Sequence, residues 1–178
     1  EYTIKISGSF QGFNRYKEGD NIGTSQDENE EKITEIQQWG DHEWINAQYA
    51  FWGAKNVDST AEDSLNLDQT QSTKLMFYDA ENFNGDIGDW DVSNVTDMNK
   101  MFRGASSFNQ DIGDWDVSNV TNMDSMFFRI ENFNGNIGDW DVGNVTDMRG
   151  MFSEADSFNQ DLSGWDVDSV TECSNFAN

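Results

Sequence analysis

The aspartates beside one recurring tryptophan carry the most evident chemistry in this chain. The string DIGDWDVSNVTDM at 86–98 returns as DIGDWDVSNVTNM, NIGDWDVGNVTDM and DLSGWDVDSVTEC, which is a repeat of 25 residues. If the repeats stack in register, equivalent carboxylates fall into two columns. The positions are Asp89 and Asp91, Asp114 and Asp116, Asp139 and Asp141, and Asp166 and Asp168.

Columns of like charge need an explanation, because neighbouring carboxylates about 5 Å apart repel by roughly 1 kcal/mol per pair in a water-like medium. Local hydrogen bonds, solvent and counterions, bound calcium, or a basic or polar ligand could each offset this repulsion. The sequence holds no EF-hand loop and no GGxGxD nonapeptide, so it does not single out calcium. The predicted ligand surface comprises Asp89, Asp91, Asp114, Asp116, Asp139, Asp141 and Asp166, and the alternative calcium site comprises Asp91, Asp116, Asp141 and Asp166.

The overall charge narrows the range of partners. Ten Lys and Arg stand against 34 Asp and Glu, a net charge of -24, which argues against nucleic acid and anionic membrane surfaces. Aromatic residues make up 13% of the chain, far more than a disordered segment carries. The single cysteine excludes an intramolecular disulfide, and no apolar run is long enough to cross a bilayer.

Two elements are expected in each repeat. Ile112, Trp115, Val117 and Val120 follow the leucine-rich-repeat strand spacing, which predicts a short strand at 114–118. Apolar residues from 120 to 133 then recur at steps of three and four, which predicts a helix. The expected helix caps are Asn94, Asn119, Asn144 and Ser169, with Asp97, Asn122, Asp147 and Glu172 three residues later.

The predicted fold is an α/β solenoid, a leucine-rich-repeat-like right-handed coil of short parallel strands and short helices with about six coils. Residues 1–32 are assigned to an N-terminal capping strand, marked by alternating Tyr2, Ile4 and Ile6, and an acidic loop. Residues 33–83 are two degenerate repeats, and 84–178 are regular 25-residue repeats, the last one truncated. We expect the chain to be a segment of a longer protein.

The strings WDVSNVTDM, MFxxAxxFNQD, ITEIQQWGDHEW and AFWGAKNV resemble the BspA-type leucine-rich-repeat surface proteins of bacteria. The resemblance covers nearly the whole chain, including YTIKISGSF at its start. It implies a repeat solenoid, a cell-surface or secreted setting, and a role in adhesion or recognition. It implies no catalytic residues and does not identify a ligand.

The recurring tryptophans could be a sugar-stacking ladder or part of the core. They share the expected strand face with the valines two residues later, so exposing them would bury the aspartates at prohibitive cost. We therefore predict that Trp90, Trp115, Trp140 and Trp165 are buried, with each indole N–H bound to an acceptor. Met98, Met123, Met148 and Cys173 are likewise predicted to be core residues.

Two further positions interrupt the pattern. Phe128 stands where Arg103 and Ser153 occupy neighbouring repeats, so it is predicted to be an exposed contact residue beside Arg129, with an ordinary exposed aromatic as the alternative. His42 is the only histidine and lies between Asp41 and Glu43. No nucleophile motif accompanies it, and we predict no enzymatic activity.

The leading functional hypothesis is a non-enzymatic adhesion or ligand-recognition module that binds a protein or polar extracellular ligand through its acidic strand face. It is expected to be monomeric, extracellular or cell-surface, and without a cofactor unless calcium binds. The alternative is a structural spacer or stalk of a larger surface protein, with calcium as a stabilising ion.

Overall fold

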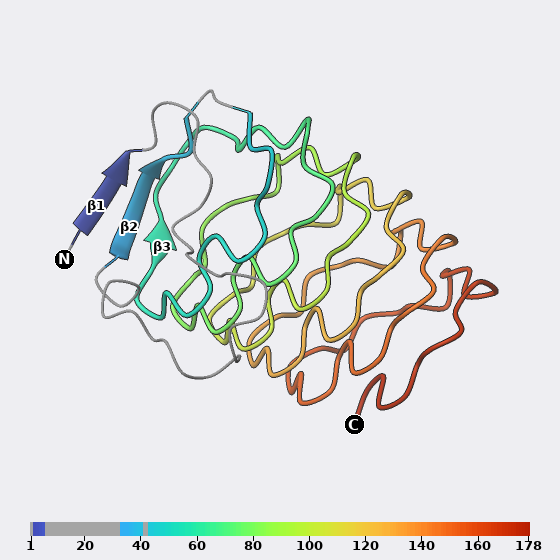
Figure 1. Cartoon of the computed structure of the whole chain (residues 1–178). Helices are drawn as coiled ribbons and strands as arrows, with labels where there is room; N and C mark the ends of the chain where they lie inside the picture. Colours follow the sequence, from blue (N-terminus) through green and yellow to red (C-terminus); the bar gives the residue numbers. More distant parts are fainter. Residues whose placement is uncertain (1, 6–32, 41–42) are drawn as a thin grey trace, which may run out of the picture.

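Three strands form one small parallel sheet near the N-terminus. The computed structural model describes residues 2–5, 33–40 and 43–178 (Figure 1). Strands β1 (Tyr2–Lys5), β2 (Ile33–Gln38) and β3 (Asp58–Ser59) lie in the order β1-β2-β3. Ile36 of β2 pairs with Ile4 of β1 and with Ser59 of β3. The predicted N-terminal strand is confirmed over 2–5, whereas Ile6 and the acidic loop lie outside the described residues.

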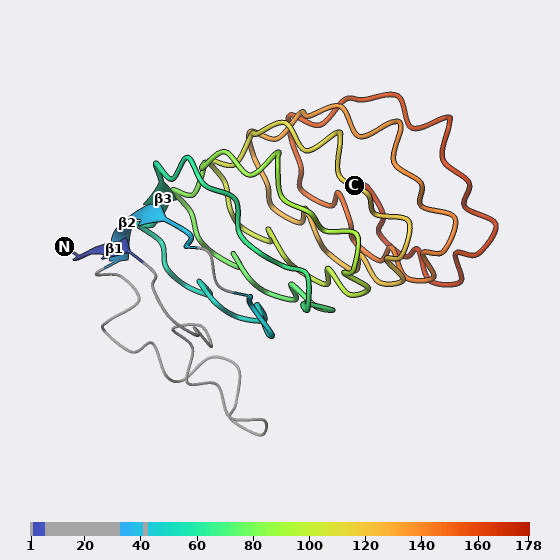
Figure 2. The ribbon, with the colours of Figure 1, turned by 90° about the horizontal axis from the view of Figure 1, so that it is seen from above.

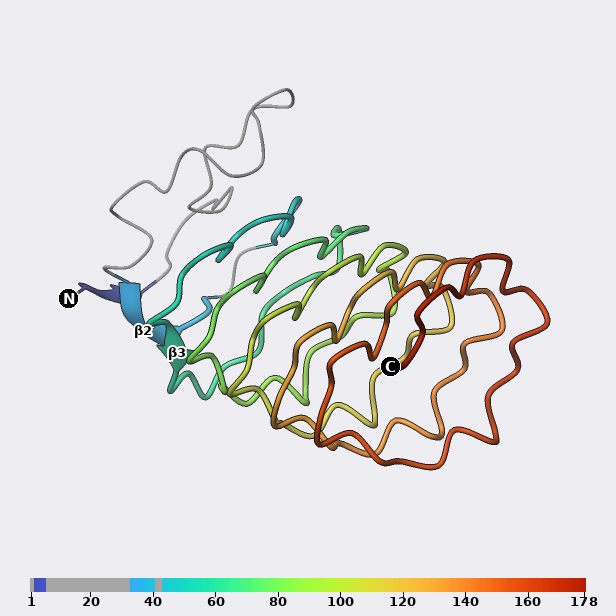
Figure 3. The same cartoon turned by 90° about the horizontal axis from the view of Figure 1, so that it is seen from below.

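The repeats stand side by side in chain order along the molecule (Figure 1, Figure 2, Figure 3). Backbone hydrogen bonds join positions 24 or 25 residues apart in neighbouring repeats. The Thr121 amide donates to the Thr96 carbonyl and the Met123 amide to the Asp147 carbonyl, both at 2.9 Å. Asn122 forms isolated parallel bridges with both Asp97 and Asp147. Residues 25 apart are therefore held in register.

The predicted fold class is wrong. Within residues 2–5, 33–40 and 43–178 the structure contains no helix, and its strands are the three of the N-terminal sheet. The strand expected at 114–118 is absent, and residues 124–129, inside the expected helix, form consecutive turns. An α/β solenoid of alternating strands and helices is not what this sequence forms.

Left-handed backbone positions explain why the helix fails. Ser125 and Arg129 have φ of 55° and 58°, and equivalent positive values recur at Lys100, Gly104, Gly150 and Glu154. A helix cannot continue through such residues. Met126 donates back to Met123, whereas the amides of Ser125, Phe127 and Arg129 donate to the next repeat. The apolar steps of three and four thus come from β-turns closed by hydrogen bonds between residues three apart.

The expected helix caps bind neighbouring repeats and local turns instead. The side-chain amides of Asn119 and Asn144 donate to the carbonyls of Ser93 and Ser118 at 2.8 and 2.7 Å. Asn122 accepts the amide of Asp124 at 2.9 Å. An asparagine side chain can donate or accept a hydrogen bond where a backbone group lacks a backbone partner.

Aromatic rings fill the space between the repeats. Phe102 stacks on Phe77 and Phe127, with ring centroids 5.6 and 6.0 Å apart, and Trp115 lies parallel to Trp140 at 6.5 Å. This packing confirms the predicted tryptophan core. The exposed fractions of Trp90, Trp115, Trp140 and Trp165 are 4%, 3%, 3% and 9%.

One predicted core residue lies outside the core. Cys173 is exposed, although Met98, Met123 and Met148 at equivalent positions are buried. Among residues 43–178, these methionines have repeats on both sides of their own, whereas only a preceding repeat lies beside Cys173. The described residues also include no helix that could cross a membrane.

Candidate functional site

In the first half of each regular repeat, all charged side chains are acidic. Segments 84–97, 109–122, 134–147 and 159–172 contain four, three, three and four Asp or Glu and no Lys or Arg. We call these four segments the acidic face. The predicted ligand aspartates are all exposed on it: Asp89, Asp91, Asp114, Asp116, Asp139, Asp141 and Asp166.

One column of these aspartates is held by local hydrogen bonds. Asp91 accepts both the backbone amide and the hydroxyl of Ser93, at 3.0 and 2.6 Å, and Asp116 accepts the same two groups of Ser118. Serine hydroxyl and amide bonds lower the pKa of the Asp91 and Asp116 carboxyls. We call Asp91, Asp116, Asp141 and Asp166 the held carboxylates, since Asp141 and Asp166 accept the amides of Gly143 and Asp168 in the same way.

The other column is open. Asp89, Asp114 and Asp139 accept no hydrogen bond from any residue that the structure describes, and we call them the open carboxylates. The equivalent position of the last repeat is Gly164. Local hydrogen bonds therefore compensate the charge of the held carboxylates. The oxygens of the open carboxylates remain available to solvent or to a ligand.

The alternative calcium site finds no support in the geometry. A hard divalent cation needs several oxygen ligands around one point. No group of three or more acidic, histidine or cysteine side chains that could hold a metal occurs in the described parts of the chain. The aspartates proposed for it, Asp91, Asp116, Asp141 and Asp166, each bind their own turn instead.

Asp41 and His42 lie outside the described residues.

Phe128 is less exposed than the sequence predicts, and its role as a contact residue stays a prediction. It is half-buried, with the guanidinium of Arg103 4.2 Å and that of Arg129 5.2 Å from its ring centroid. Arg129 also binds Glu154 at 2.9 Å. Two cations therefore contact the aromatic face of Phe128. Each such contact contributes about 0.5–1 kcal/mol at an exposed site.

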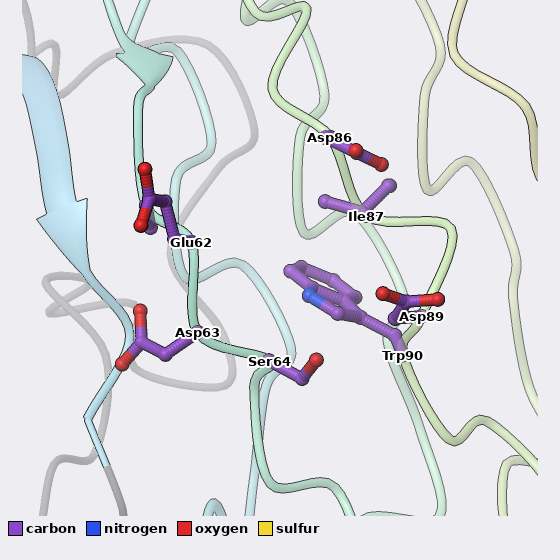
Figure 4. A pocket seen from close by; sticks show the side chains of 8 residues that line it. Glu62, Asp63, Ser64, Asp86, Ile87, Asp89 and Trp90 are labelled. Carbon is purple, nitrogen blue, oxygen red and sulfur yellow. The ribbon is translucent and has the colours of Figure 1, made fainter.

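A pocket that sequence reasoning missed lies where the degenerate repeats meet the regular ones. It measures about 60 Å³ and is lined by eight residues. Carboxylates of Glu62, Asp63, Asp86 and Asp89 surround it, and the indole nitrogen of Trp90 lies on the ring edge turned towards Asp63 and Ser64 (Figure 4). A second, more open hollow of about 350 Å³ shares Glu62 and Asp63 with it.

The sequence signal for this pocket was present at Glu62. In the regular repeats this position holds Ile87, Ile112 and Ile137, which are buried, whereas Glu62 is exposed. A carboxylate cannot occupy the apolar site of an isoleucine without a large desolvation cost, so Glu62 lies exposed at this position. A charged residue at a core position of the repeat was the clue.

Comparisons with known proteins match the chain to one family. No curated protein matches it, and no solved structure does. Residues 22–128 and 71–178 both match a family described as Mycoplasma protein of unknown function, DUF285. Because these overlapping matches cover most of the sequence, the chain belongs to the DUF285 family.

Proposed function

We propose that this chain is a non-enzymatic recognition module of a bacterial surface protein, which binds a basic or polar extracellular partner through its acidic face. The observation that carries the proposal is the column of open carboxylates. Asp89, Asp114 and Asp139 are exposed, in register, and free of hydrogen bonds from the described residues.

Charge segregation supports a basic partner. All six basic residues within 43–178 lie outside the acidic face, namely Lys55, Lys74, Lys100, Arg103, Arg129 and Arg149. Several of them are paired, for example Lys100 with Asp124 at 3.1 Å and Lys55 with Glu81 at 3.0 Å. No cation of the four acidic segments competes for the open carboxylates, so a face of one sign is left to steer an oppositely charged partner.

The surface setting and adhesive role rest on the resemblance of WDVSNVTDM and MFxxAxxFNQD to BspA-type surface proteins. Membership of the DUF285 family is compatible with this assignment but does not specify a partner. The held carboxylates contribute to the general negative field. The open carboxylates make the direct contacts.

A pair of double variants tests the proposal. Asp114→Asn with Asp139→Asn removes two open carboxylates, and Asp116→Asn with Asp141→Asn removes two held ones, so both lower the negative charge equally. The probe is a lysine-rich peptide, with a glycine-serine peptide of equal length as the neutral control. Two exposed ion pairs of about 0.5 kcal/mol each predict a roughly fivefold weaker Kd for the open variant.

The two variants are compared by titration calorimetry over a range of salt concentrations. We expect the open variant to bind more weakly and to show a shallower salt dependence than the held variant. Equal affinity of the two variants for the lysine-rich peptide would contradict a contact role for the open carboxylates. It would favour a spacer whose acidity serves only solubility.

A further inference from the structure

The tryptophan of the first regular repeat lacks the hydrogen bond that its equivalents make. The indole N–H groups of Trp115, Trp140 and Trp165 donate to the carbonyls of Ile87, Ile112 and Ile137, at 3.1, 3.0 and 2.9 Å. Each acceptor lies 28 residues earlier in the chain. For Trp90 the corresponding residue is Glu62, and its carbonyl does not accept this bond.

Trp90 therefore buries a donor without an acceptor among the described residues. Its side chain is 4% exposed, and its Nε1 atom has no hydrogen-bond partner. Trp39 packs edge to face against it, with ring centroids 5.0 Å apart, and supplies no acceptor atom. A buried N–H without a partner costs about 1–3 kcal/mol, so a bound group that accepts this bond would recover that cost.

The pocket beside this N–H is rich in hydrogen-bond acceptors. Asp63 already receives the backbone amides of Trp39 and Gly40, at 2.9 and 2.7 Å, and Asp86 receives that of Gly88 at 3.2 Å. Glu62 and Asp89 accept no hydrogen bond from the described residues. Figure 4 shows Glu62 and Asp63 on the side that the indole nitrogen faces, and Asp89 on the other side of the ring. The pocket offers one unmet donor and two free carboxylates.

The adjoining hollow adds neutral polar groups. Gln37, Gln38 and Thr60 line it together with Glu62 and Asp63. Its volume of about 350 Å³ lies at the lower end of the range for small-ligand pockets. The smaller pocket can take one edge of a ligand whose remainder lies in this hollow.

We propose that the Glu62–Asp63–Trp90 pocket binds a neutral polyhydroxylated ligand, a saccharide, whose hydroxyls donate to Glu62 and Asp89 and accept the Trp90 N–H. A hydroxyl group both donates and accepts, which matches both needs of this pocket. Ammonium and guanidinium groups have no acceptor and would leave the indole N–H unpaired. A divalent cation would not find three ligating side chains among the described residues.

This site goes beyond the recognition of basic partners proposed above. It shares only Asp89 with the open carboxylates and does not use Asp114 or Asp139. The variants that test it therefore leave Asp89 unchanged, and the two proposals can fail independently.

Indole N–H resonances provide a direct measurement on the whole chain. In ¹⁵N–¹H spectra each tryptophan gives one such signal, and the probes are glucose, galactose, mannose, N-acetylglucosamine and glycerol, with calcium chloride and a lysine-rich peptide as separate arms. We expect at least one saccharide to shift the Trp90 signal saturably. The signals of Trp115, Trp140 and Trp165 should not move, because their N–H groups are already bound.

Two variants connect the signal to the pocket. Trp90→Phe keeps an aromatic ring and removes the N–H, and Glu62→Gln keeps the shape of the side chain and removes its charge. Each should weaken saccharide binding by about tenfold or more, measured by calorimetry, because a hydrogen bond to a buried or charged partner is lost. Trp115→Phe and Glu81→Gln are the matched controls and should bind as the unmodified chain does.

Three outcomes would overturn the proposal. In the first, no saccharide moves the Trp90 signal, which means that the pocket holds water only. In the second, only calcium or the lysine-rich peptide moves it. In the third, Trp90→Phe binds the saccharide as tightly as Trp115→Phe. Weaker peptide binding by the Asp114 and Asp139 variant, with an intact saccharide response, would separate this site from the acidic face.

Discussion

The indole N–H of Trp115 donates to the carbonyl of Ile87 at 3.1 Å, across 28 residues of sequence. This bond ties the interior of one repeat to the backbone of the preceding one. Trp140 and Trp165 repeat it, and Trp90 does not. Stacked rings and these N–H bonds together make the repeats cohere, since each repeat shares its core with its neighbours.

The missing bond predicts a difference in stability between two equivalent substitutions. Trp115→Phe removes ring volume and the bond to Ile87, whereas Trp90→Phe removes ring volume and a buried N–H that has no partner. We expect Trp115→Phe to lower the free energy of unfolding by at least about 1 kcal/mol more than Trp90→Phe, because one variant loses a buried hydrogen bond and the other loses an unpaired donor. Urea denaturation of the two variants measures this difference. Equal losses would show that the Ile87 bond contributes nothing.

The sequence predicted the interior of the repeats but not their backbone. Burial of Trp115 followed from its parity with Val117 and from the cost of burying Asp114 and Asp116, because side-chain polarity alone decides which face turns inward. The helix prediction is wrong at Ser125, because a serine in the sequence does not indicate a positive φ. Apolar steps of three and four are shared by helices and by successive β-turns.

The candidate sites were also predictable to different degrees, because side-chain polarity can be read from the sequence and turn geometry cannot. Exposed aspartates follow directly from the repeat, whereas the division into open and held carboxylates depends on turns that place Ser93 and Ser118 two residues later. The pocket at Trp90 depends on how Glu62 and Asp63 lie beside Trp90, which becomes visible only when both repeats are placed in space.

Two glycines at left-handed positions provide a second test. Gly104 and Gly150 have φ of 74° and 58°, so alanine at either position costs about 1 kcal/mol in backbone strain. A methyl group at Gly104 would also overlap the carboxylate of Asp79, whereas at Gly150 its nearest neighbour is the Ser125 hydroxyl at 3.3 Å. We therefore expect Gly104→Ala to be the more destabilising of the two.

Thermal and urea unfolding of both alanine variants would measure this effect. The second comparison is Ser125→Gly, which relieves the φ of 55° but removes the 2.6 Å hydrogen bond from the Ser125 hydroxyl to Asp124, so it should change stability little. If Gly150→Ala proves as costly as Gly104→Ala, the overlap with Asp79 is relieved by movement of that side chain.

Asp79 predicts an unusual pH dependence. Burial raises the pKa of the Asp79 carboxyl, and the nearby cations of Arg103 and Lys55 oppose this with smaller effects. A raised folded-state pKa means that the folded chain binds the proton more tightly than the unfolded chain does. The contribution of Asp79 to stability therefore falls as pH rises from the unfolded pKa through the folded one.

Asp79→Asn should consequently be more stable than the unmodified chain at neutral pH, by less than about 1 kcal/mol because the site is partly solvated. Asparagine also tolerates the φ of 53° at this position. The gain should vanish below the unfolded pKa, where Asp79 is protonated in both states. Urea unfolding at several pH values measures it, and a gain that persists in acid would contradict the burial explanation.

Asp91→Asn is the counterpart with the opposite sign. Hydrogen bonds from Ser93 lower the pKa of the Asp91 carboxyl, so its stabilising contribution is present above the unfolded pKa and is lost as pH falls through the folded pKa. We expect Asp91→Asn to be less stable than the unmodified chain at neutral pH and equal to it in strong acid. A variant that is equally stable at neutral pH would mean that the Ser93 bonds add nothing beyond solvation.

Calcium should leave the thermal unfolding of this chain unchanged. An ion that binds only the folded state raises the melting temperature with its concentration by mass action. The described residues offer no group of three suitable ligands, and the held carboxylates bind their own turns. Melting curves in EDTA and in excess calcium should therefore coincide, with magnesium as a control for ionic strength. A rise specific to calcium that disappears in the Asp116 and Asp141 double variant would place an ion on the held column.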